Sequence, residues 1–256
     1  VIPVVSRQVT ETGDFVGRVT AIDKVDIVAR VPGFIEERLF AEGQKVKTGD
    51  LLFRLEQATY KAAVEQQRAN LARAKATAVN TALQLQRGQD LVRNQNIPQS
   101  TLDQLSADDA GAQAEVMQAQ ALLDQAQINL GYTSIQAPFD GRVGISNFSV
   151  GALVGPSSGA LATIVSQDPI YVLFPVSDRF ILDVQQATGT GRVEPQNVAV
   201  KLTLANGSQY PQVGKIDFTD VKVDQNTDTL MVRAEFANPQ RTLTDRRYPH
   251  EPGGDD

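Results

Sequence analysis

The chain has 256 residues, of which 41% are hydrophobic and 6% aromatic, and its formal net charge is −6. This length and apolar content allow one substantial core or several small ones, whereas the scarcity of aromatic residues argues against a pocket for a bulky cofactor. The negative charge argues against a nucleic-acid partner, because phosphate contacts need a basic face. The absence of Cys excludes disulfides, thiolate metal sites and cysteine nucleophiles.

The N-terminal part alternates short apolar runs with turns. Val1 begins an apolar run within residues 1–8, residues 9–24 are predicted to form a further strand, and residues 25–56 hold short strands separated by glycine-containing turns. No apolar run approaches the roughly 20 residues needed to span a bilayer. Because the chain begins with Val1 rather than Met, we expect a mature or trimmed form that lacks a signal peptide or anchor.

Residues 57–130 carry a heptad repeat in each of two arms. In the second arm, apolar residues fall at the alternating three- and four-residue steps of a coiled-coil seam, at Leu102, Leu105, Ala112, Val116, Ala119, Leu123, Ala126 and Leu130. Asp109 alone interrupts this series. The first arm repeats every seven residues, at Val64, Leu71, Ala78, Leu85 and Val92. Asn94 and Pro98 between the arms disfavour a continuous helix, so we predict an antiparallel helical hairpin, ended by Gly131 as a left-handed cap.

The segment after the hairpin, residues 131–167, repeats the spacing of the segment before it. Gly43 lies ten positions after Gly33, and Gly151 lies ten positions after Gly141. Two similar halves on either side of an insertion predict one pseudo-symmetric β-sandwich whose central turn is replaced by the hairpin. The two ends of the hairpin must then lie close together.

The pattern over residues 168–245 indicates a small antiparallel barrel. Four runs are predicted strands, namely residues 170–176, 198–204, 213–218 and 229–236. Gly207 follows an Asn in a strong hairpin-turn signal, and residues 177–187 are predicted to form a short helix capped by Ser177 or Asp178. The strand predicted at residues 9–24 has no partner elsewhere, so we assign it to this barrel.

Five segments in this order resemble the periplasmic adaptor proteins, or membrane fusion proteins, of tripartite efflux pumps, in particular the AcrA/MexA type that serves resistance-nodulation-division (RND) transporters. They are residues 31–35, 42–52, 137–143, 168–172 and 214–239. The resemblance implies an elongated multidomain α+β protein. In it, a lipoyl-like β-sandwich is split by a long antiparallel α-helical coiled-coil hairpin and followed by a small antiparallel β-barrel. The membrane-proximal domain would be mostly missing, with residues 1–8 as its remnant, and we expect residues 246–256 to be a disordered tail.

The resemblance also implies a function and partners. Such adaptors are non-enzymatic, need no cofactor, and link an inner-membrane RND proton-driven drug exporter to an outer-membrane channel protein. They work in the periplasm of Gram-negative bacteria, self-associate into a ring that is typically a hexamer, and bind no nucleic acid. This chain would reach the membrane only through a missing N-terminal anchor.

Family members often carry a motif at the hairpin tip that consists of Arg, Leu four residues later and Ser seven residues after that. Arg87 and Leu91 match this motif, whereas Pro98 stands where the Ser is expected and Ser100 offers the nearest hydroxyl. The candidate residues for binding the outer-membrane duct are therefore Arg87, Leu91, Asn94, Asn96, Pro98 and Ser100.

Other interpretations stay open from the sequence. The same fold serves adaptors of ABC-type exporters and of type I secretion systems, and a lipoyl or biotinyl carrier domain shares the sandwich, although a carrier needs a Lys at the turn that the hairpin replaces. The hairpin is alternatively an internal coiled coil that only stabilises the fold. Asp224 and Asp228 flank a polar loop, which is either a cation site or a solvated turn. His250 is the only His, and no partner for metal or base chemistry is identified for it.

Overall fold

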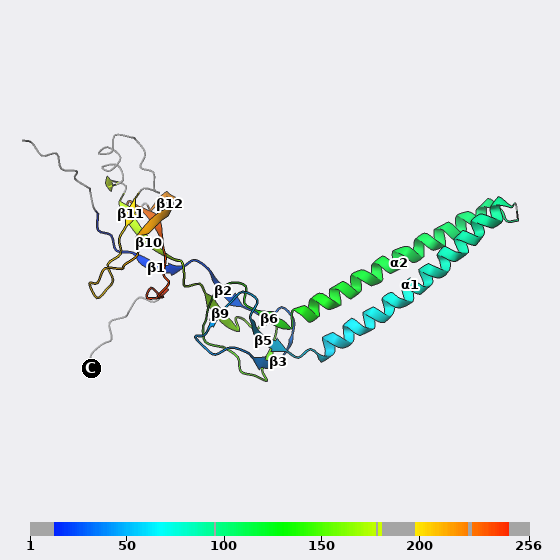
Figure 1. Cartoon of the computed structure of the whole chain (residues 1–256), viewed down its shortest axis with the longest axis horizontal. Coiled ribbons are helices and arrows are strands. Elements are labelled where there is room, and N and C mark those ends of the chain that lie inside the picture. Colours follow the sequence, from blue (N-terminus) through cyan, green and yellow to red (C-terminus); the bar gives the residue numbers. More distant parts are fainter. Residues whose placement is uncertain (1–12, 95, 178, 181–197, 225–226, 246–256) are drawn as a thin grey trace, which may run out of the picture. The chain divides into compact units, whose positions relative to one another are not determined.

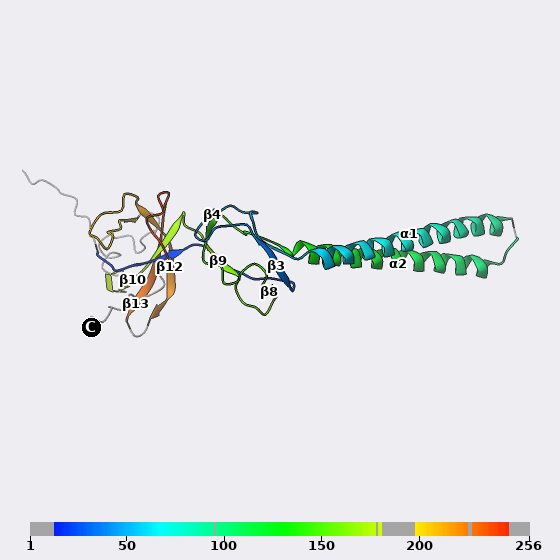
Figure 2. The ribbon, with the colours of Figure 1, turned by 90° about the horizontal axis from the view of Figure 1, so that it is seen from below.

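The structure is a computed structural model that describes residues 13–94, 96–177, 179–180, 198–224 and 227–245. The expectations for residues 1–12 and 246–256, and for most of the helix predicted at residues 177–187, lie outside these ranges. Two compact units make up the chain, and their elements appear in Figure 1 and Figure 2 in colours that follow the sequence.

Eight short strands form the β-sandwich, four before the hairpin and four after it. The first four are β2 (Lys24–Ile27), β3 (Gly33–Arg38), β4 (Lys45–Val46) and β5 (Leu51–Leu55). The last four are β6 (Ser134–Gln136), β7 (Gly141–Val143), β8 (Leu153–Val154) and β9 (Ala162–Val165). Glycines with positive φ turn the chain between them, for example Gly43 (φ 74°) and Gly151 (φ 90°), where other residues would be strained.

The two halves exchange strands to make two equivalent sheets. Their orders are β2-β9-β7-β4 and β6-β5-β3-β8. Read position by position, the two orders pair β2 with β6, β9 with β5, β7 with β3 and β4 with β8. Each pair consists of equivalent strands from the two halves of the chain. This arrangement confirms the predicted internal repeat, and it buries Leu52, Phe53 and Leu55 of β5 completely.

Two long helices form the hairpin, α1 (Ala58–Arg93) and α2 (Gln99–Gly131). They run antiparallel in both ribbon views, and at 1.5 Å per residue they are about 54 and 50 Å long. The predicted heptad residues are buried or half-buried between them, with a cluster at Val64, Leu71, Ala74, Ala119 and Leu123. The predicted seam is therefore confirmed.

Hydrogen bonds tie the two ends of the hairpin together, as an insertion requires. Gln57 Nε2 donates to Thr133 Oγ1 (3.0 Å) and lies 3.1 Å from Ser134 Oγ. The prediction for Gly131 was wrong: it is the last residue of α2 and is not among the glycines with positive φ. Tyr132 takes the cap position in a right-handed conformation, and its backbone N–H bonds the carbonyls of Ile128 and Leu130. No left-handed residue is needed at Gly131, because the N–H of Tyr132 still makes the helical hydrogen bond to the Ile128 carbonyl.

Among the described residues, the β-barrel is one five-stranded antiparallel sheet of order β1-β10-β13-β12-β11. Its strands are β1 (Arg18–Ala21), β10 (Ile170–Ser177), β11 (Ala199–Val200), β12 (Gly214–Asp224) and β13 (Thr229–Phe236). β1 pairs with β10, as predicted for this segment, whereas Lys24 already begins β2. The core lies under β10 and β13, where Ile170, Ala234 and Phe236 are almost completely buried.

Two barrel strands differ in length from the predicted ones. The strand expected at residues 198–204 is reduced to β11 and an isolated bridge between Thr203 and Gln209. β12 runs beyond the predicted residue 218 to Asp224, and its register with β13 shifts twice. Alternation of apolar residues marks a half-buried strand but does not report bulges or missing partners. The predicted turn at Gly207 (φ 83°) is confirmed.

A completely buried Asn238 links the beginning and end of the barrel chain. Its Nδ2 donates to the carbonyls of Gln167 (2.8 Å) and Leu243 (2.9 Å), and its backbone N–H donates to Asp168 Oδ1 (2.7 Å). The Tyr210 hydroxyl lies 3.1 Å from Asn238 Oδ1. All side-chain hydrogen-bonding groups of Asn238 are therefore paired, as a buried amide requires.

Candidate docking surface at the hairpin tip

The seam that carries the tip contains one close approach of the two helices. Gly88 of α1 is buried, and a Cβ on it would lie 2.5 Å from Leu105 Cδ1 of α2. Heptad spacing puts position 88 in the seam, where a side chain is normally packed. The missing side chain instead lets Leu105 fill the space, which fixes how closely the arms meet near the tip.

Asp109, which interrupts the apolar series, is paired inside the seam. It is 8% exposed, and its Oδ2 accepts from Gln113 Nε2 at 2.6 Å. The Thr81 hydroxyl shares its proton between the Ala78 carbonyl (3.0 Å) and Asp109 Oδ1 (3.2 Å). This contact from α1 to α2 is a polar seam pair, and such pairs select one register over its neighbours.

Backbone hydrogen bonds shape the connection between the arms. The N–H of Asn94 bonds the Asp90 carbonyl (3.3 Å), and the N–H of Asn96 bonds the Leu91 carbonyl (2.9 Å). Pro98 is the N-cap of α2 in an extended conformation, and Ser100 lies in the first turn. Pro98 thus starts the second helix in place of the expected Ser, and the side chains of Asn94, Asn96, Pro98 and Ser100 are all exposed.

Arg87 and Leu91 lie one helical turn apart on the outer surface of α1, so the structure brings these two predicted residues together. Leu91 is 42% exposed although it is apolar, because it lies outside the heptad seam. Arg87 is exposed and has no ion pair among the described residues. An unpaired cation beside an exposed leucine suits a surface that docks onto another protein.

Sequence reasoning missed the continuation of this surface toward the root of the hairpin. Leu83 and Val79 precede Arg87 by one and two turns, and they are 45% and 62% exposed. In the sequence, this surface is marked by apolar residues at four-residue steps outside the seam. The heptad pattern of the seam does not include these positions.

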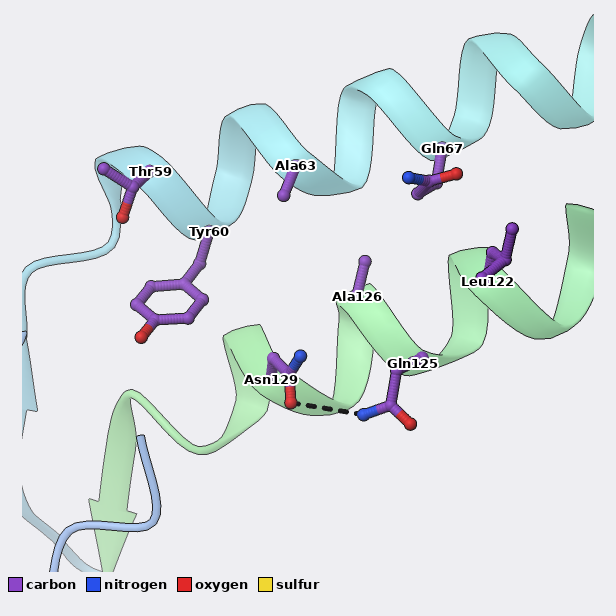
Figure 3. Close-up of a pocket in the computed structure, with 8 residues that line it drawn as sticks. All are labelled: Thr59, Tyr60, Ala63, Gln67, Leu122, Gln125, Ala126 and Asn129. Atoms are coloured by element: carbon purple, nitrogen blue, oxygen red, sulfur yellow. Dashed lines mark hydrogen bonds between the residues drawn. The ribbon is translucent and has the colours of Figure 1, made fainter. Parts of the chain in front are cut away.

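The arms leave an open groove of about 480 Å³ near the root of the hairpin. Its lining, shown in Figure 3, consists of Thr59, Tyr60, Ala63, Gln67, Leu122, Gln125, Ala126 and Asn129. Small seam residues such as Ala126 fill little of the space, while the Tyr60 hydroxyl donates to the Pro32 carbonyl at 2.7 Å. Gln125 and Asn129 bond each other along α2 at 3.2 Å, so the groove has no convergent set of polar groups for a ligand.

The described part of the chain contains no cluster of three or more His, Cys, Asp or Glu that could hold a metal ion. The N–H of Asp228 bonds the Asp224 carbonyl at 2.8 Å. Among the described helices, none is long and apolar enough to cross a membrane.

Two family models cover nearly all of this architecture. Residues 23–167 match the barrel-sandwich hybrid domain of RND membrane fusion proteins (MFPs), and residues 169–249 match the β-barrel domain of the same family. The chain belongs to the RND membrane fusion proteins. The family is thus the one that the sequence segments indicated, and it accounts for the split sandwich and for the barrel that follows it.

Known members of the family align along almost the whole chain. The efflux pump periplasmic linker BepF of Brucella suis biovar 1 is 56% identical over 97% of this chain and 60% of BepF. The multidrug efflux pump subunit AcrA of Escherichia coli is 36% identical over 95% of this chain and 62% of AcrA. The multidrug resistance protein MexA of Pseudomonas aeruginosa is 35% identical over 96% and 61%. The chain thus spans about three fifths of the length of these relatives.

Solved structures of membrane fusion proteins share the fold. A MacA–MexA chimera that contains the MexA α-hairpin domain superposes with a TM-score of 0.62 at 28% identity, over 90% of this chain and 76% of the chimera. MacA of Actinobacillus actinomycetemcomitans gives a TM-score of 0.61 at 25% identity, over 90% and 74%. These likenesses support the α+β class with a helical hairpin and antiparallel sheets.

Proposed function

We propose that this chain is the adaptor of an RND-type multidrug efflux pump and links an inner-membrane RND transporter to an outer-membrane channel protein from the periplasm. The observation that carries the proposal is the match to both RND membrane fusion models in sequence order, around a hairpin whose tip exposes unpaired groups. The names of BepF and AcrA as efflux pump components support it. RND-specific models favour an RND partner over an ATP-driven exporter.

The adaptor works by shape and assembly rather than by chemistry. The hairpin extends the chain by about 50 Å and presents the tip residues to the outer-membrane channel. Leu91 supplies the apolar contact and Arg87 the charge that steers and orients docking. Self-association of several copies around the exit path belongs to the same proposal.

The test measures drug efflux in cells whose own adaptor gene is deleted and replaced by variants. Leu91→Asp and Arg87→Glu are expected to lower efflux strongly while expression and helix content stay normal, because both residues are exposed and outside the seam. The matched control is Arg73→Glu. Arg73 is also exposed and lies two heptads before Arg87 on the same face of α1. Normal efflux in both tip variants would contradict docking through the tip.

A further inference from the structure

The heptad seam of the hairpin is interrupted in the outer half of the arms. Thr81 of α1 bonds Asp109 of α2 across the seam. Because the helices are antiparallel, each residue further along α1 is level with a residue equally far back along α2. Gln57 and Thr133, which bond each other at the root, obey the same relation. The relation therefore holds from the root to the interruption, and it assigns the seam residues to successive layers.

Two successive layers at the interruption lack a large apolar side chain. One layer consists of Ala78 and Ala112, and the next consists of Thr81 and Asp109. Toward the root, the buried apolar cluster of the seam consists of Val64, Leu71, Ala74, Ala119 and Leu123. Neither Ala78 nor Ala112 belongs to this cluster, so the buried apolar packing that begins at the root stops short of Asp109.

The tip side of these two layers holds a separate apolar group. Its large seam side chains are half-buried rather than buried, namely Leu85, Val92, Leu102 and Leu105. We call residues 82–93 of α1 and residues 99–108 of α2 the distal module. Paired helices are stabilised mainly by the apolar surface that they bury against each other. The distal module, which buries less of each large side chain, is therefore held together more weakly than the root.

Asp109 places a carboxylate in the seam at a cost in stability. The residue is 8% exposed, and none of the ion pairs among the described residues includes it. A buried charge without a counter-charge is unfavourable, and an apolar replacement of similar volume is often stabilising. The register of the arms does not depend on Asp109 alone, because the contact of Gln57 with Thr133 already sets it at the root. Its place between two apolar groups points instead to a role as the boundary between them.

We propose that the Thr81–Asp109 layer divides the hairpin into two cooperative units, and that the distal module opens and closes while the root stays paired. Arg87 and Leu91 lie in the distal module, so its opening changes their positions relative to α2. Opening also exposes the half-buried leucines of both arms and adds them to the apolar surface that docks onto the channel protein. This use in docking rests on the adaptor function proposed above, whereas the division of the hairpin does not.

Native-state hydrogen exchange of the full chain tests the division. The amides of the distal module are expected to share one opening equilibrium, with protection about tenfold or more below that of the root, which is the factor that burial of one leucine supplies. Asp109→Leu fills the boundary layer with an apolar side chain and is expected to raise the distal protection by about tenfold. This variant leaves no buried group unpaired, because the Thr81 hydroxyl still bonds the Ala78 carbonyl and Gln113 is exposed.

The matched control is Asp108→Leu, which adds the same side chain one residue away. Asp108 is exposed and accepts a hydrogen bond from Gln104 along α2 at 2.8 Å, so this variant is expected to leave the distal protection unchanged. Asp109→Asn keeps a polar side chain of the same size in the layer and is expected to keep the two units separate. A smooth gradient of protection from root to tip in the parent would overturn the proposal. A folded Asp109→Leu variant with unchanged distal protection would overturn it as well.

Engineered disulfides test whether opening is used in docking, because the chain has no native Cys. Leu85→Cys/Leu105→Cys joins the arms within the distal module, and Leu71→Cys/Ala119→Cys joins one layer of the root. The distal disulfide is expected to cause a loss of drug efflux that a reducing agent reverses, whereas the root disulfide is expected to leave efflux normal. Normal efflux with the distal disulfide formed would reject the use of opening in docking. If Leu91→Asp still lowered efflux, the adaptor function itself would be retained.

Discussion

Two glycines inside the hairpin helices give a matched pair of substitutions with opposite expected effects. Gly111 of α2 is exposed, and a Cβ on it would have no atom within 4 Å. Gly costs about 1 kcal/mol relative to Ala inside a helix. Gly111→Ala is therefore expected to raise the free energy of unfolding of the hairpin by up to about 1 kcal/mol.

Gly88→Ala gains the same helix propensity but meets the opposite arm. The new Cβ would lie 2.5 Å from Leu105 Cδ1, so the leucine must rotate away or the helices must separate. Overpacking of this kind costs about 1–3 kcal/mol. After the gain of about 1 kcal/mol is subtracted, the variant is expected to lie between neutral and about 2 kcal/mol less stable than the parent.

Urea unfolding followed by helical circular dichroism, together with hydrogen exchange of the helix amides, measures both effects. The two variants are expected to differ by about 1–3 kcal/mol. Leu105→Ala should cost less in the Gly88→Ala background than in the parent, because it removes the obstructing group. Equal stabilisation by Gly88→Ala and Gly111→Ala would refute the close approach of the arms at this position.

The remaining predictions concern the barrel. Asn238→Asp removes both donors from the buried carbonyls of Gln167 and Leu243 and is expected to cost about 2–6 kcal/mol in urea unfolding; a loss below about 1 kcal/mol would contradict the role of this side chain. Burial, and then the negative charge of Asp168, raise the pKa of Tyr210 above its ordinary value. The protonated phenol therefore contributes stability that is complete below about pH 10 and is lost as the pH rises through the folded-state pKa. Urea midpoints measured across this range should fall more steeply for the parent than for Tyr210→Phe, and parallel curves would contradict the assignment.

Local patterns in the sequence were sufficient for much of the fold. The heptads of α1 and α2 depend only on spacing along one helix, and the Asn-Gly turn at Gly207 depends only on two neighbouring residues. The repeat of glycine spacing around the hairpin predicted two equivalent halves, which the two sheet orders confirm. Arg87 and Leu91 were found by comparison with a tip motif, and spacing already put them on one helical face.

Other features were decided only by which segments meet in three dimensions. The sandwich halves exchange strands, so β3 pairs with β8 from the other half of the chain, and no periodicity within either half specifies that partner. Gly131 continues α2 instead of ending it in a left-handed turn, and Tyr132 caps the helix through its backbone N–H.

The hairpin shows the same division. Its sequence predicted the heptad seam that is buried between α1 and α2, but only the tertiary structure showed that Val79 and Leu83 outside that seam are left exposed. The reason is physical: periodicity records that a face is apolar, whereas burial depends on the partner that covers it.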